Sequence, residues 1–556
     1  MSLPLVPLLA PLLLPLPLTS AAVFCYLALT ATALGYAYFR HSRRRLYELA
    51  AKIPGPRGLP LVGHALHTIV KIFKTVLGYA NEFPQDTPLK LWIGPVLYVA
   101  VVDPRDIEAV LGSSEHLDKS GEYNFFRPWF GNGLLISSGD HWRAHRKLIA
   151  PTFHLSVLKS FVELFNANSR GVVEKMRKEA KAGHEFDVHE YMSEATVEIL
   201  LETAMGVSKK EQKSGLEYAL AVMKMCDILH MRHTRFWLYP DLLFRLSKHF
   251  GEQTRLLGII HGLTKRVIQS KKAEFLKGVR GPLASDPIVS ATPEAPKEAK
   301  PDIRAEDNDV GQKQRLAFLE LLIESSQNGA ALTDQDIKEE VDTIMFEGHD
   351  TTAAGSSFFL CMMGLYPDIQ DRVVEELDQI FGDSDRAATF QDTLRMKYLE
   401  RCLMETLRLY PPVPIIGRKL KHDDKMPSTG ALLPAGCTVM VGIYKVHRDP
   451  AVYPDPEAFN PDNFLPERCA NRHYYSFVPF SAGPRSCVGR KYAVLKLKIL
   501  LSTILRSYRV GATVPEKDWK LTGDVILKRA DGFRISLQPR RTKADTAAPT
   551  HKAPLS

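Results

Sequence analysis

Apolar residues recur three and four positions apart along most of the chain, a pattern that is typical of amphipathic helices. Two stretches instead carry β-forming residues. Residues 89–102 surround Gly94-Pro95 and predict a hairpin, and a second strand pair near the C-terminus is expected to turn at Asp531-Gly532. The pattern therefore predicts a mainly α fold, one large domain with a small β region.

The N-terminal residues predict a membrane anchor. Residues 1–39 contain no charged side chain, and Leu18–Phe39 is an apolar run of about the 20 residues that span a bilayer core as a helix. Basic residues lie between positions 40 and 45, so the positive-inside rule predicts a single-pass anchor with the body on the cytosolic face. A cleaved signal peptide is the alternative, but its basic residues would normally precede the apolar run.

Three further segments differ in character from the helical body. Residues 40–60 are expected to form a connector that is first basic and then rich in proline and glycine; its part at 53–60 should be extended, because these residues break helices. The large domain is expected at 61–540. Within it, residues 278–313 hold five prolines and many charges, which predicts a mobile surface insertion, and residues 541–556 are expected to be a disordered tail.

Composition narrows the possible partners. The net charge of +9 favours an acidic partner or an anionic membrane surface. Nucleic acid is disfavoured, because the chain has no zinc-knuckle spacing, basic heptad region or aromatic RNA-binding motif. The seven cysteines are widely spaced and form no Cys-x-x-Cys pair, which argues against a disulfide framework or a cysteine zinc site and favours a reducing compartment.

The strongest chemical signal is the run Phe480-Ser-Ala-Gly483-Pro-Arg485-Ser-Cys487-Val-Gly489. A cysteine thiolate binds iron and pushes electron density onto it, which favours cleavage of bound dioxygen. The glycines would let the backbone approach a flat macrocycle, while the arginine could pair with a haem propionate and the phenylalanine could shield the sulfur. A buried core cysteine is the alternative, but five specified residues in ten positions match by chance in on the order of one chain in ten thousand.

This run resembles the haem-binding signature of the cytochrome P450 superfamily, and the resemblance extends from about residue 54 to residue 538. It implies the P450 fold, haem b with Cys487 as the metal ligand, and monooxygenase activity with dioxygen and electrons from NADPH-cytochrome P450 reductase. Glu405 and Arg408 resemble a helical pair that the family completes with a third residue, here Arg468. Cys469 departs from the pattern, since the family usually has an aromatic residue there.

The resemblance also assigns basic residues. Trp142 and Arg146, in the run Trp142-Arg-Ala-His-Arg146, and Arg418 match positions that reach the haem propionates. From the residues alone, each would be interpreted as a surface group. A basic face that docks an acidic electron donor is expected to include Arg143, Lys147, Arg490, Lys491, Lys496 and Lys498. The alternative is that these charges form only a solvated surface.

One long helix is expected opposite the cysteine. A Thr333-x-x-Asp336 capping box predicts its start, and it should run to about Tyr366. Gly348 lies in its middle, where glycine costs up to about 1 kcal/mol. Accepting that cost suggests that the glycine opens a groove for dioxygen above the haem.

Glu347, Asp350 and Thr351 surround this glycine. Asp350 and Thr351 would relay protons to dioxygen, although a helix kink with hydroxyls bonded to their own backbone is the alternative. The run Glu347-Gly-His-Asp-Thr-Thr352 resembles that of family four of the superfamily. In that family the glutamate can be esterified to a haem methyl. A carboxylate facing haem is costly, so a tether, a protonated state or a water network is needed.

The substrate follows from resemblance alone. Family four mostly oxidises the chain ends of fatty acids, eicosanoids and terpenoids, while segments 463–468, 471–475 and 278–313 are most similar to its insect subfamily G. That subfamily implies oxidative decarbonylation of long-chain aldehydes to cuticular hydrocarbons. An apolar channel, with the aromatic stretch Tyr123–Phe130 as candidate lining, would suit such a substrate. An ω-hydroxylase and a reductase-independent isomerase or lyase stay open as alternatives, although Asp350-Thr351 argues against the latter.

Overall fold

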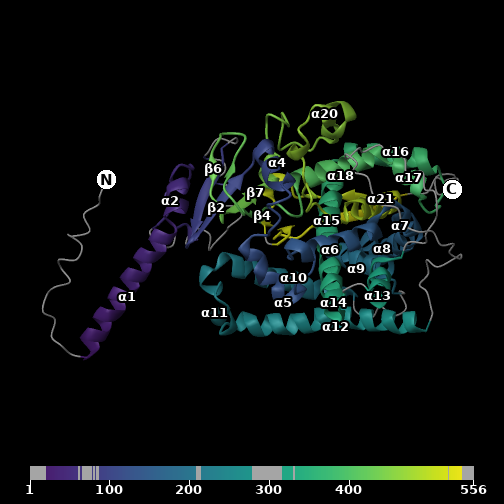
Figure 1. Cartoon of the computed structure of the whole chain (residues 1–556). Coiled ribbons are helices and arrows are strands. Elements are labelled where there is room, and N and C mark those ends of the chain that lie inside the picture. Colours follow the sequence, from purple (N-terminus) through teal and green to yellow (C-terminus); the bar gives the residue numbers. More distant parts are fainter. Residues whose placement is uncertain are drawn as a thin grey trace, which may run out of the picture.

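The computed structural model of the chain describes residues 20–59, 63–65, 78, 82, 87–207, 215–277, 316–329, 332–523 and 525–540. The expected insertion at 278–313 and tail at 541–556 lie outside these residues, as do the first 19. Helices dominate the described chain (Figure 1). They are α1 (Ser20–Ser42), α2 (Arg44–Ala51), α4 (Pro104–Gly112), α5 (Arg127–Phe130), α6 (Gly139–Ile149), α7 (Leu155–Ser160), α8 (Val162–Ala182), α9 (His189–Thr203), α10 (Gly215–Thr234), α11 (Asp241–Arg245), α12 (Lys248–Leu276), α13 (Phe318–Gln327), α14 (Asp334–Glu347), α15 (Asp350–Leu365), α16 (Pro367–Phe381), α17 (Phe390–Arg395), α18 (Lys397–Leu409), α19 (Ile443–Val446), α20 (Pro466–Ala470) and α21 (Arg490–Ser507).

Short sheets make up the β region. In the largest, with strand order β1-β2-β7-β4, β1 (Leu89–Ile93) and β2 (Val96–Val101) form the predicted antiparallel hairpin, and Gly94 supplies its turn with φ 55°. β2 runs parallel to β7 (Thr438–Val441), which pairs with β4 (Ile416–Lys419). The remaining strands are β3 (Phe186–Asp187), β5 (Asp424–Lys425), β6 (Leu432–Leu433), β8 (Tyr508–Gly511), β9 (Leu521–Gly523), β10 (Leu527–Arg529) and β11 (Arg534–Pro539).

The second predicted hairpin is wrong. Gly532 does turn the chain, with φ 82°, but the strands on its two sides belong to different sheets. β10 pairs with β9, whereas β11 pairs with β3 and β8. A Cβ on Gly532 would lie 2.7 Å from Oδ2 of Asp187 on β3, so the turn brings β11 against β3 instead of back onto β10.

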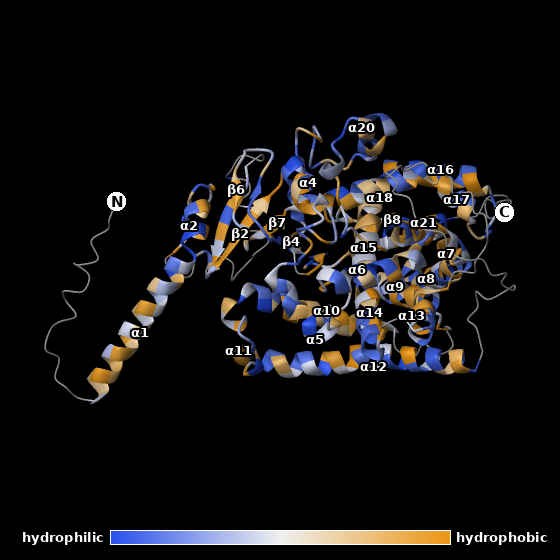
Figure 2. Cartoon of the chain, viewed as in Figure 1, coloured by the Kyte–Doolittle hydropathy of each residue, from blue (hydrophilic) through white to orange (hydrophobic). Residues whose placement is uncertain are grey.

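α1 projects away from the body of the protein (Figure 1) and is apolar over most of its length (Figure 2). None of its residues is buried, and its length and composition suffice to cross a membrane. The helix ends at Ser42, three residues beyond the predicted end at Phe39. An apolar helix with no packing partner in the described chain is what a membrane anchor requires.

The first half of the connector at 40–60 is helical and includes α2, which packs on the largest sheet. Tyr47 on this helix stacks on Trp92 of β1, with ring centroids 4.9 Å apart. Ile53 then enters the smaller apolar core under the largest sheet. Extended chain begins only at Pro54, whose carbonyl accepts a hydrogen bond from the backbone N–H of Lys90.

α15 lies at the centre of the larger core, in line with α14 (Figure 1). Thirteen of its 16 residues are buried, so this helix is enclosed on all sides instead of presenting a polar face to water. It packs against α9, α18 and β8. Its first turn therefore lies in the protein interior, where any change in helical hydrogen bonding must be compensated by other groups.

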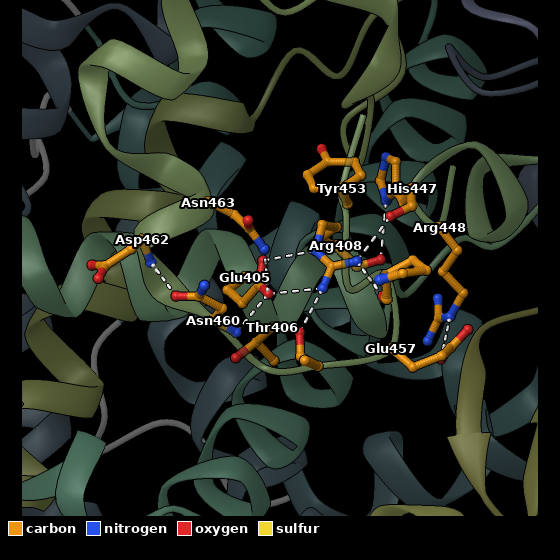
Figure 3. Close-up of polar contacts among 12 residues, drawn as sticks. Glu405, Thr406, Arg408, His447, Arg448, Tyr453, Glu457, Asn460, Asp462 and Asn463 are labelled. Atoms are coloured by element: carbon orange, nitrogen blue, oxygen red, sulfur yellow. Dashed lines mark hydrogen bonds and ion pairs between the residues drawn. The ribbon is translucent and has the colours of Figure 1, made fainter. Parts of the chain in front are cut away.

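Glu405 and Arg408 on α18 form a fully buried ion pair (Figure 3). Nε and Nη2 of Arg408 donate to the two carboxylate oxygens at 2.7 and 2.8 Å. The other N–H groups donate to the carbonyls of His447, Pro456 and Ala458. Hydrogen bonding at Nε and at both Nη atoms offsets the free-energy cost of burying this guanidinium.

His447 connects this pair to the chain that leads to Cys487. Its Nδ1 lies 3.2 Å from the carbonyl oxygen of Arg408, and its Nε2 accepts the backbone N–H of Val478 at 2.9 Å. Burial lowers the pKa of His447 to about 3, so the ring is neutral and carries its proton on Nδ1. α18 thus fixes the backbone two residues before Phe480.

The predicted participation of Arg468 in the pair is wrong. Arg468 is exposed on α20, and its Nη1 lies 3.5 Å from Oδ1 of Asn463. Oε1 of Glu405 instead accepts Nδ2 of Asn463 at 3.1 Å and the backbone N–H of Asn460 at 2.8 Å. One carboxylate already balances one guanidinium, so neutral donors complete the site without a further buried charge.

Glu405→Gln tests how much this pair stabilises the fold. The change nearly preserves shape but leaves the Arg408 guanidinium buried without its counter-charge, so we expect the free energy of unfolding in urea to fall by about 3–5 kcal/mol. Glu457→Gln is the matched control, because Glu457 pairs with Arg448 at 3.0 Å with 73% of its side chain exposed. The control should cost less than about 1 kcal/mol. Equally small effects of both changes would contradict this account.

Candidate active site

A cavity of about 220 Å³ separates the Cys487 segment from the junction of α14 and α15. Segments that are far apart in the sequence meet there, from Lys119 before α6 to Leu497 on α21. The predicted site residues that line the cavity are Trp142, Arg146, Glu347, Thr351, Phe480, Arg485, Cys487 and Gly489. Three others, Gly483, Asp350 and Arg418, do not line it, and their contacts explain why.

A tight turn presents Cys487 to the cavity. Its backbone N–H donates to the carbonyl of Phe480 at 2.9 Å. Ser481, with φ 58°, is the one non-glycine residue of the described chain with a positive φ. Such a conformation persists only where the surrounding structure enforces it, and it is concentrated at functional sites. The loop is therefore shaped to expose one sulfur atom.

The groups around the sulfur have opposing effects on the pKa of the Cys487 thiol. Burial and the Glu347 carboxylate raise the pKa of the Cys487 thiol to about 11, against the lowering effects of a backbone hydrogen bond from Gly489 and of Arg146. A metal cation at Sγ would reverse this balance, because a coordinating thiol is deprotonated outright. The Gly489 N–H is the backbone donor expected beside a thiolate ligand.

Gly483 serves a different purpose from the one predicted. Its φ is 69°, and a Cβ there would lie 1.9 Å from the carbonyl oxygen of Leu111 in α4. This glycine is required because the cysteine loop packs directly on the backbone of α4. Approach to a macrocycle does not explain it, since Gly483 does not face the cavity.

Basic side chains lie at and near the cavity: Lys119 and Arg146 are half-buried in its wall, and Arg418 is buried behind it. Arg418 on β4 is 2% exposed, and within the described residues its guanidinium has one hydrogen bond, to the carbonyl of Gly417, and no carboxylate partner. Lys119 lines the cavity, and burial lowers its pKa well below the ordinary lysine value. Burial also lowers the pKa of Arg146. Buried cations without counter-charges are costly, so this donor set fits a ligand that brings anionic groups, as haem propionates would.

Arg485 is largely occupied by main-chain acceptors. Nη1 donates to the carbonyls of Leu117 and Ser137, and Nη2 to those of Leu134 and Leu135. The guanidinium also lies over the Trp142 ring, 4.7 Å from its centroid. Arg485 therefore holds the loop before α6 in place, and the hydrogen bonds of the described structure leave Nε for a propionate.

The long helix predicted opposite the cysteine is interrupted. Its capping box at Thr333 and Asp336 is confirmed, but α14 ends at Glu347 and α15 begins at Asp350. A Cβ on Gly348 would lie 2.9 Å from Cδ1 of Leu200, so packing against α9 explains the glycine as much as an open groove does.

Two threonine hydroxyls satisfy backbone carbonyls at this break. Oγ1 of Thr351 donates to the carbonyl of Glu347 at 2.6 Å, and Oγ1 of Thr352 donates to that of Gly348 at 2.8 Å. These are the self-bonded hydroxyls of the alternative interpretation. Thr351 nevertheless lines the cavity, and its oxygen lone pairs can accept a proton donor there.

Lys496 reaches the same break from α21. Its Nζ donates to the carbonyl of Gly348 at 2.8 Å and to Oγ1 of Thr352 at 2.9 Å, and burial lowers its pKa to about 7. The prediction that Lys496 and Lys498 belong to an exposed basic face is wrong. Lys498 is also buried and pairs with Glu400 at 2.7 Å. The predicted basic residues that are exposed are Arg143, Lys147, Arg490 and Lys491.

Asp350 points away from the cavity. It is fully buried, and its carboxylate pairs with Nζ of Lys528 on β10 at 2.9 Å. Burial raises the pKa of Asp350, but Lys528 more than offsets this effect and holds it below the ordinary value. Of the two residues predicted to relay protons, only Thr351 faces the cavity. No sequence signal identified Lys528, because the contact joins residues that are far apart in the chain.

A second cavity of about 260 Å³ adjoins the first. The residues that line both are Tyr123, Leu135, Glu347, Thr351 and Val413. Of the aromatic residues predicted to line a substrate channel, Tyr123 and Phe126 line the second cavity. Trp129 and Phe130 are instead buried in the larger core. The two cavities therefore adjoin at Glu347 and Thr351.

Lys528→Met should destabilise the protein in a pH-dependent way. At about pH 8 the variant must bury the Asp350 carboxylate without its partner, and we expect unfolding to become easier by about 3–5 kcal/mol. Burial then raises the pKa of Asp350, so the folded variant takes up a proton on acidification and its deficit should narrow by about pH 5.5. Urea denaturation at both pH values tests this. Adding Asp350→Asn should recover much of the loss, and equal deficits at both pH values would contradict the account.

Comparisons with known proteins agree with this geometry. The Cytochrome P450 family model matches residues 53–536. The chain is 58% identical to cytochrome P450 4g15 of Drosophila melanogaster, over 94% of this chain and 97% of the relative, and 51% identical to cytochrome P450 4g1 of the same species, over 92% and 93%. It is 37% identical to cytochrome P450 4V2 of Homo sapiens, over 87% and 89%. With a cysteine loop facing an interrupted helix across a cation-lined cavity, the chain belongs to the cytochrome P450 family, as a haem-thiolate monooxygenase of family four.

Proposed function

We propose that this monooxygenase converts long-chain fatty aldehydes to hydrocarbons by oxidative decarbonylation. The observation that carries the proposal is the second cavity of about 260 Å³, which lies beside the haem site at Glu347 and Thr351 and leaves room for an alkyl chain when haem occupies the first cavity. The similarity to the two relatives named 4g supports it, because subfamily G implies this reaction and its cuticular products. The apolar helix α1 would keep the enzyme where such substrates dissolve.

Family members use haem b with dioxygen and NADPH-derived electrons. In this chain Cys487 would bind the iron, and Arg418, Lys119 and Arg146 would meet the propionates. The bound haem supplies the activation of dioxygen. Glu347 faces the same space, and burial raises the pKa of its carboxyl, an effect opposed by Lys119. A protonated acid or an ester to the haem would each remove the cost of that buried charge.

Thr351 would manage protons next to the substrate. Its hydroxyl lies at the cavity wall, with its own proton donated to the Glu347 carbonyl. The Asp350–Lys528 pair lies on the side of the helix facing away from the cavity and would set the local field without touching the substrate. Apolar walls formed by Leu200, Ile344 and their neighbours would exclude water, which keeps proton delivery under the control of this hydroxyl.

Electron supply would use a separate face. Arg143, Lys147, Arg490 and Lys491 are exposed on α6 and α21, the helices that border the cysteine loop. They would dock the acidic surface of NADPH-cytochrome P450 reductase and accelerate encounter. With α1 in the endoplasmic reticulum membrane, both partners would lie on the cytosolic face.

One observation favours ω-hydroxylation as a second candidate. The second cavity has polar groups away from the residues it shares with the first, namely Glu122, His233 and Tyr98, whose hydroxyl donates to Glu122. They would meet the end of a substrate that is distant from Thr351. A fatty acid or terpenoid with a polar far end would use these groups, whereas a simple aldehyde has only a methyl group there.

Product analysis separates the two. Microsomes that contain this protein and its reductase should convert octadecanal to the hydrocarbon one carbon shorter, detected by gas chromatography and dependent on NADPH and dioxygen. Microsomes with Cys487→Ala serve as the matched blank. An ω-hydroxylated product without hydrocarbon would overturn decarbonylation and support the second candidate.

Cys487→Ala should abolish the thiolate-ligand absorption spectrum of the haem protein, because no other cysteine lines the cavity within the described residues. Cys469→Ala is the matched control, since Cys469 is exposed on α20 and should leave the spectrum unchanged. Absorption measurements on the reduced carbon monoxide complexes make the comparison. A Cys487→Ala protein that kept the thiolate spectrum would refute the ligand assignment.

Thr351→Ala should uncouple electron use from product formation. Without the hydroxyl at the cavity wall, we expect product per NADPH consumed to fall about tenfold or more, with the excess electrons lost to peroxide or water. Thr351→Ser retains a hydroxyl that can bond the Glu347 carbonyl and should stay near the wild-type ratio. If both variants coupled as well as wild type, the hydroxyl would have no role in proton delivery.

A further inference from the structure

A group of potential metal ligands lies outside the cavity, where α6 meets the first turn of α14. His141, His145 and Asp336 each offer a ligand atom, and these atoms all lie within 4.8 Å of one another. None of the three lines either cavity. The haem site and the proposed oxidation leave this cluster without a role.

The two histidines occupy one face of α6. They are four residues apart, which is about one helical turn, and their rings stack with centroids 3.9 Å apart. This is the spacing by which paired histidines on a helix bind one zinc ion. Nε2 of His141 is buried and has no hydrogen-bond partner within the described residues. A buried polar nitrogen without a partner is costly, and a bound ion would remove that cost.

His145 is held in the orientation that a metal-binding histidine usually has. It is 7% exposed, and its Nδ1 lies 2.8 Å from Oε1 of Glu340, whose side chain is fully buried. Oε2 of Glu340 also accepts the backbone N–H of Leu134, so the carboxylate is fixed. A carboxylate on one ring nitrogen sets the tautomer and leaves the other nitrogen's lone pair for a metal.

Asp336 provides the oxygen ligand. In the capping box its Oδ2 accepts both the backbone N–H and Oγ1 of Thr333, at 2.8 and 2.6 Å. These bonds keep the group ionised, so the pKa of Asp336 is below its ordinary value although burial alone would raise it. Both cap bonds use the same oxygen, so Oδ1 takes part in neither of them.

We propose that His141, His145 and Asp336 bind one divalent transition metal ion, with zinc as the best match, and that water completes the coordination. Two imidazoles and one carboxylate form a common three-ligand set for zinc, at about 2.0–2.2 Å from each donor atom. Donors at those distances lie roughly 3.4 Å apart around a tetrahedral ion. Small side-chain rotations would therefore close the group on the ion, and any proton on the ligating nitrogens would be released.

The site would join two elements that build the haem pocket. α6 presents Trp142 and Arg146 to the cavity, and α14 ends at Glu347 on its wall. Within the described residues the His145–Glu340 contact already links these helices. Because the three ligands come together only in the folded chain, bound zinc would stabilise the folded state.

Zinc titration of the full-length, haem-loaded protein tests the proposal. The protein should carry no polyhistidine tag and should first be dialysed against a chelator. Equilibrium dialysis with metal analysis should find one zinc per haem at micromolar zinc, and zinc should raise the thermal midpoint. His141→Gln and Asp336→Asn should each weaken binding tenfold or more and abolish the thermal effect. His141 lies outside the haem cavity, so an unchanged haem spectrum verifies that the variant is folded.

Two matched variants serve as controls. His184→Gln removes an exposed histidine elsewhere, and Asp334→Asn removes a charge from the same first turn of α14, where Asp334 pairs with Lys272. Both should bind zinc as wild type does. X-ray absorption at the zinc edge should show nitrogen and oxygen ligands with two imidazoles. Absence of zinc binding would overturn the proposal. Binding that survives His141→Gln, or sulfur coordination, would also overturn it and would indicate an adventitious ion only.

Discussion

The architecture depends on satisfying the backbone where the central helix breaks. Ending α14 at Glu347 and restarting at Asp350 interrupts the helical hydrogen bonding in the protein interior, and the freed carbonyl oxygens need other donors. Thr351 and Thr352 supply hydroxyls, and Lys496 supplies an ammonium from α21. α21 begins three residues after Cys487, so the bond from Lys496 ties the two walls of the cavity together. The break and the cysteine loop are consequently held in a fixed relation.

Buried charges divide into two groups around this core. Glu405–Arg408 and Asp350–Lys528 are paired within the chain, and they position elements without facing the cavity. Arg418 on β4 is buried near the cavity and has no carboxylate partner among the described residues. An unpaired buried cation with few hydrogen bonds is costly, and a ligand that supplies negative charge would offset that cost. The counter-charges thus distinguish the two structural ion pairs from Arg418, which fits a group that binds an anionic cofactor.

The parts of the fold that the sequence predicted are local. The turn at Gly94, the capping box at Thr333 and the cysteine loop each depend on a few consecutive residues with strong conformational preferences. The partners of Asp350 and Glu405 could not be predicted in the same way, because they are set by the packing of distant segments. A turn signal likewise does not specify which strands pair, and a lysine in a helical pattern does not reveal burial. The family resemblance identified residues that line the cavity, but it did not identify the residues that hold them in place, such as Lys528 and Asn463.

Lys496 also makes the assembly of this interior an acid–base reaction. Its pKa falls from 10.5 in a solvated chain to about 7 when the ammonium is buried, because desolvation disfavours the charged form. Between those values the unfolded chain holds a proton that the folded chain gives up. Folding therefore releases a proton to solvent, and this residue's contribution to stability grows as the solution becomes more alkaline. The group that closes the helix break thus couples the integrity of the haem pocket to proton activity in the surrounding medium.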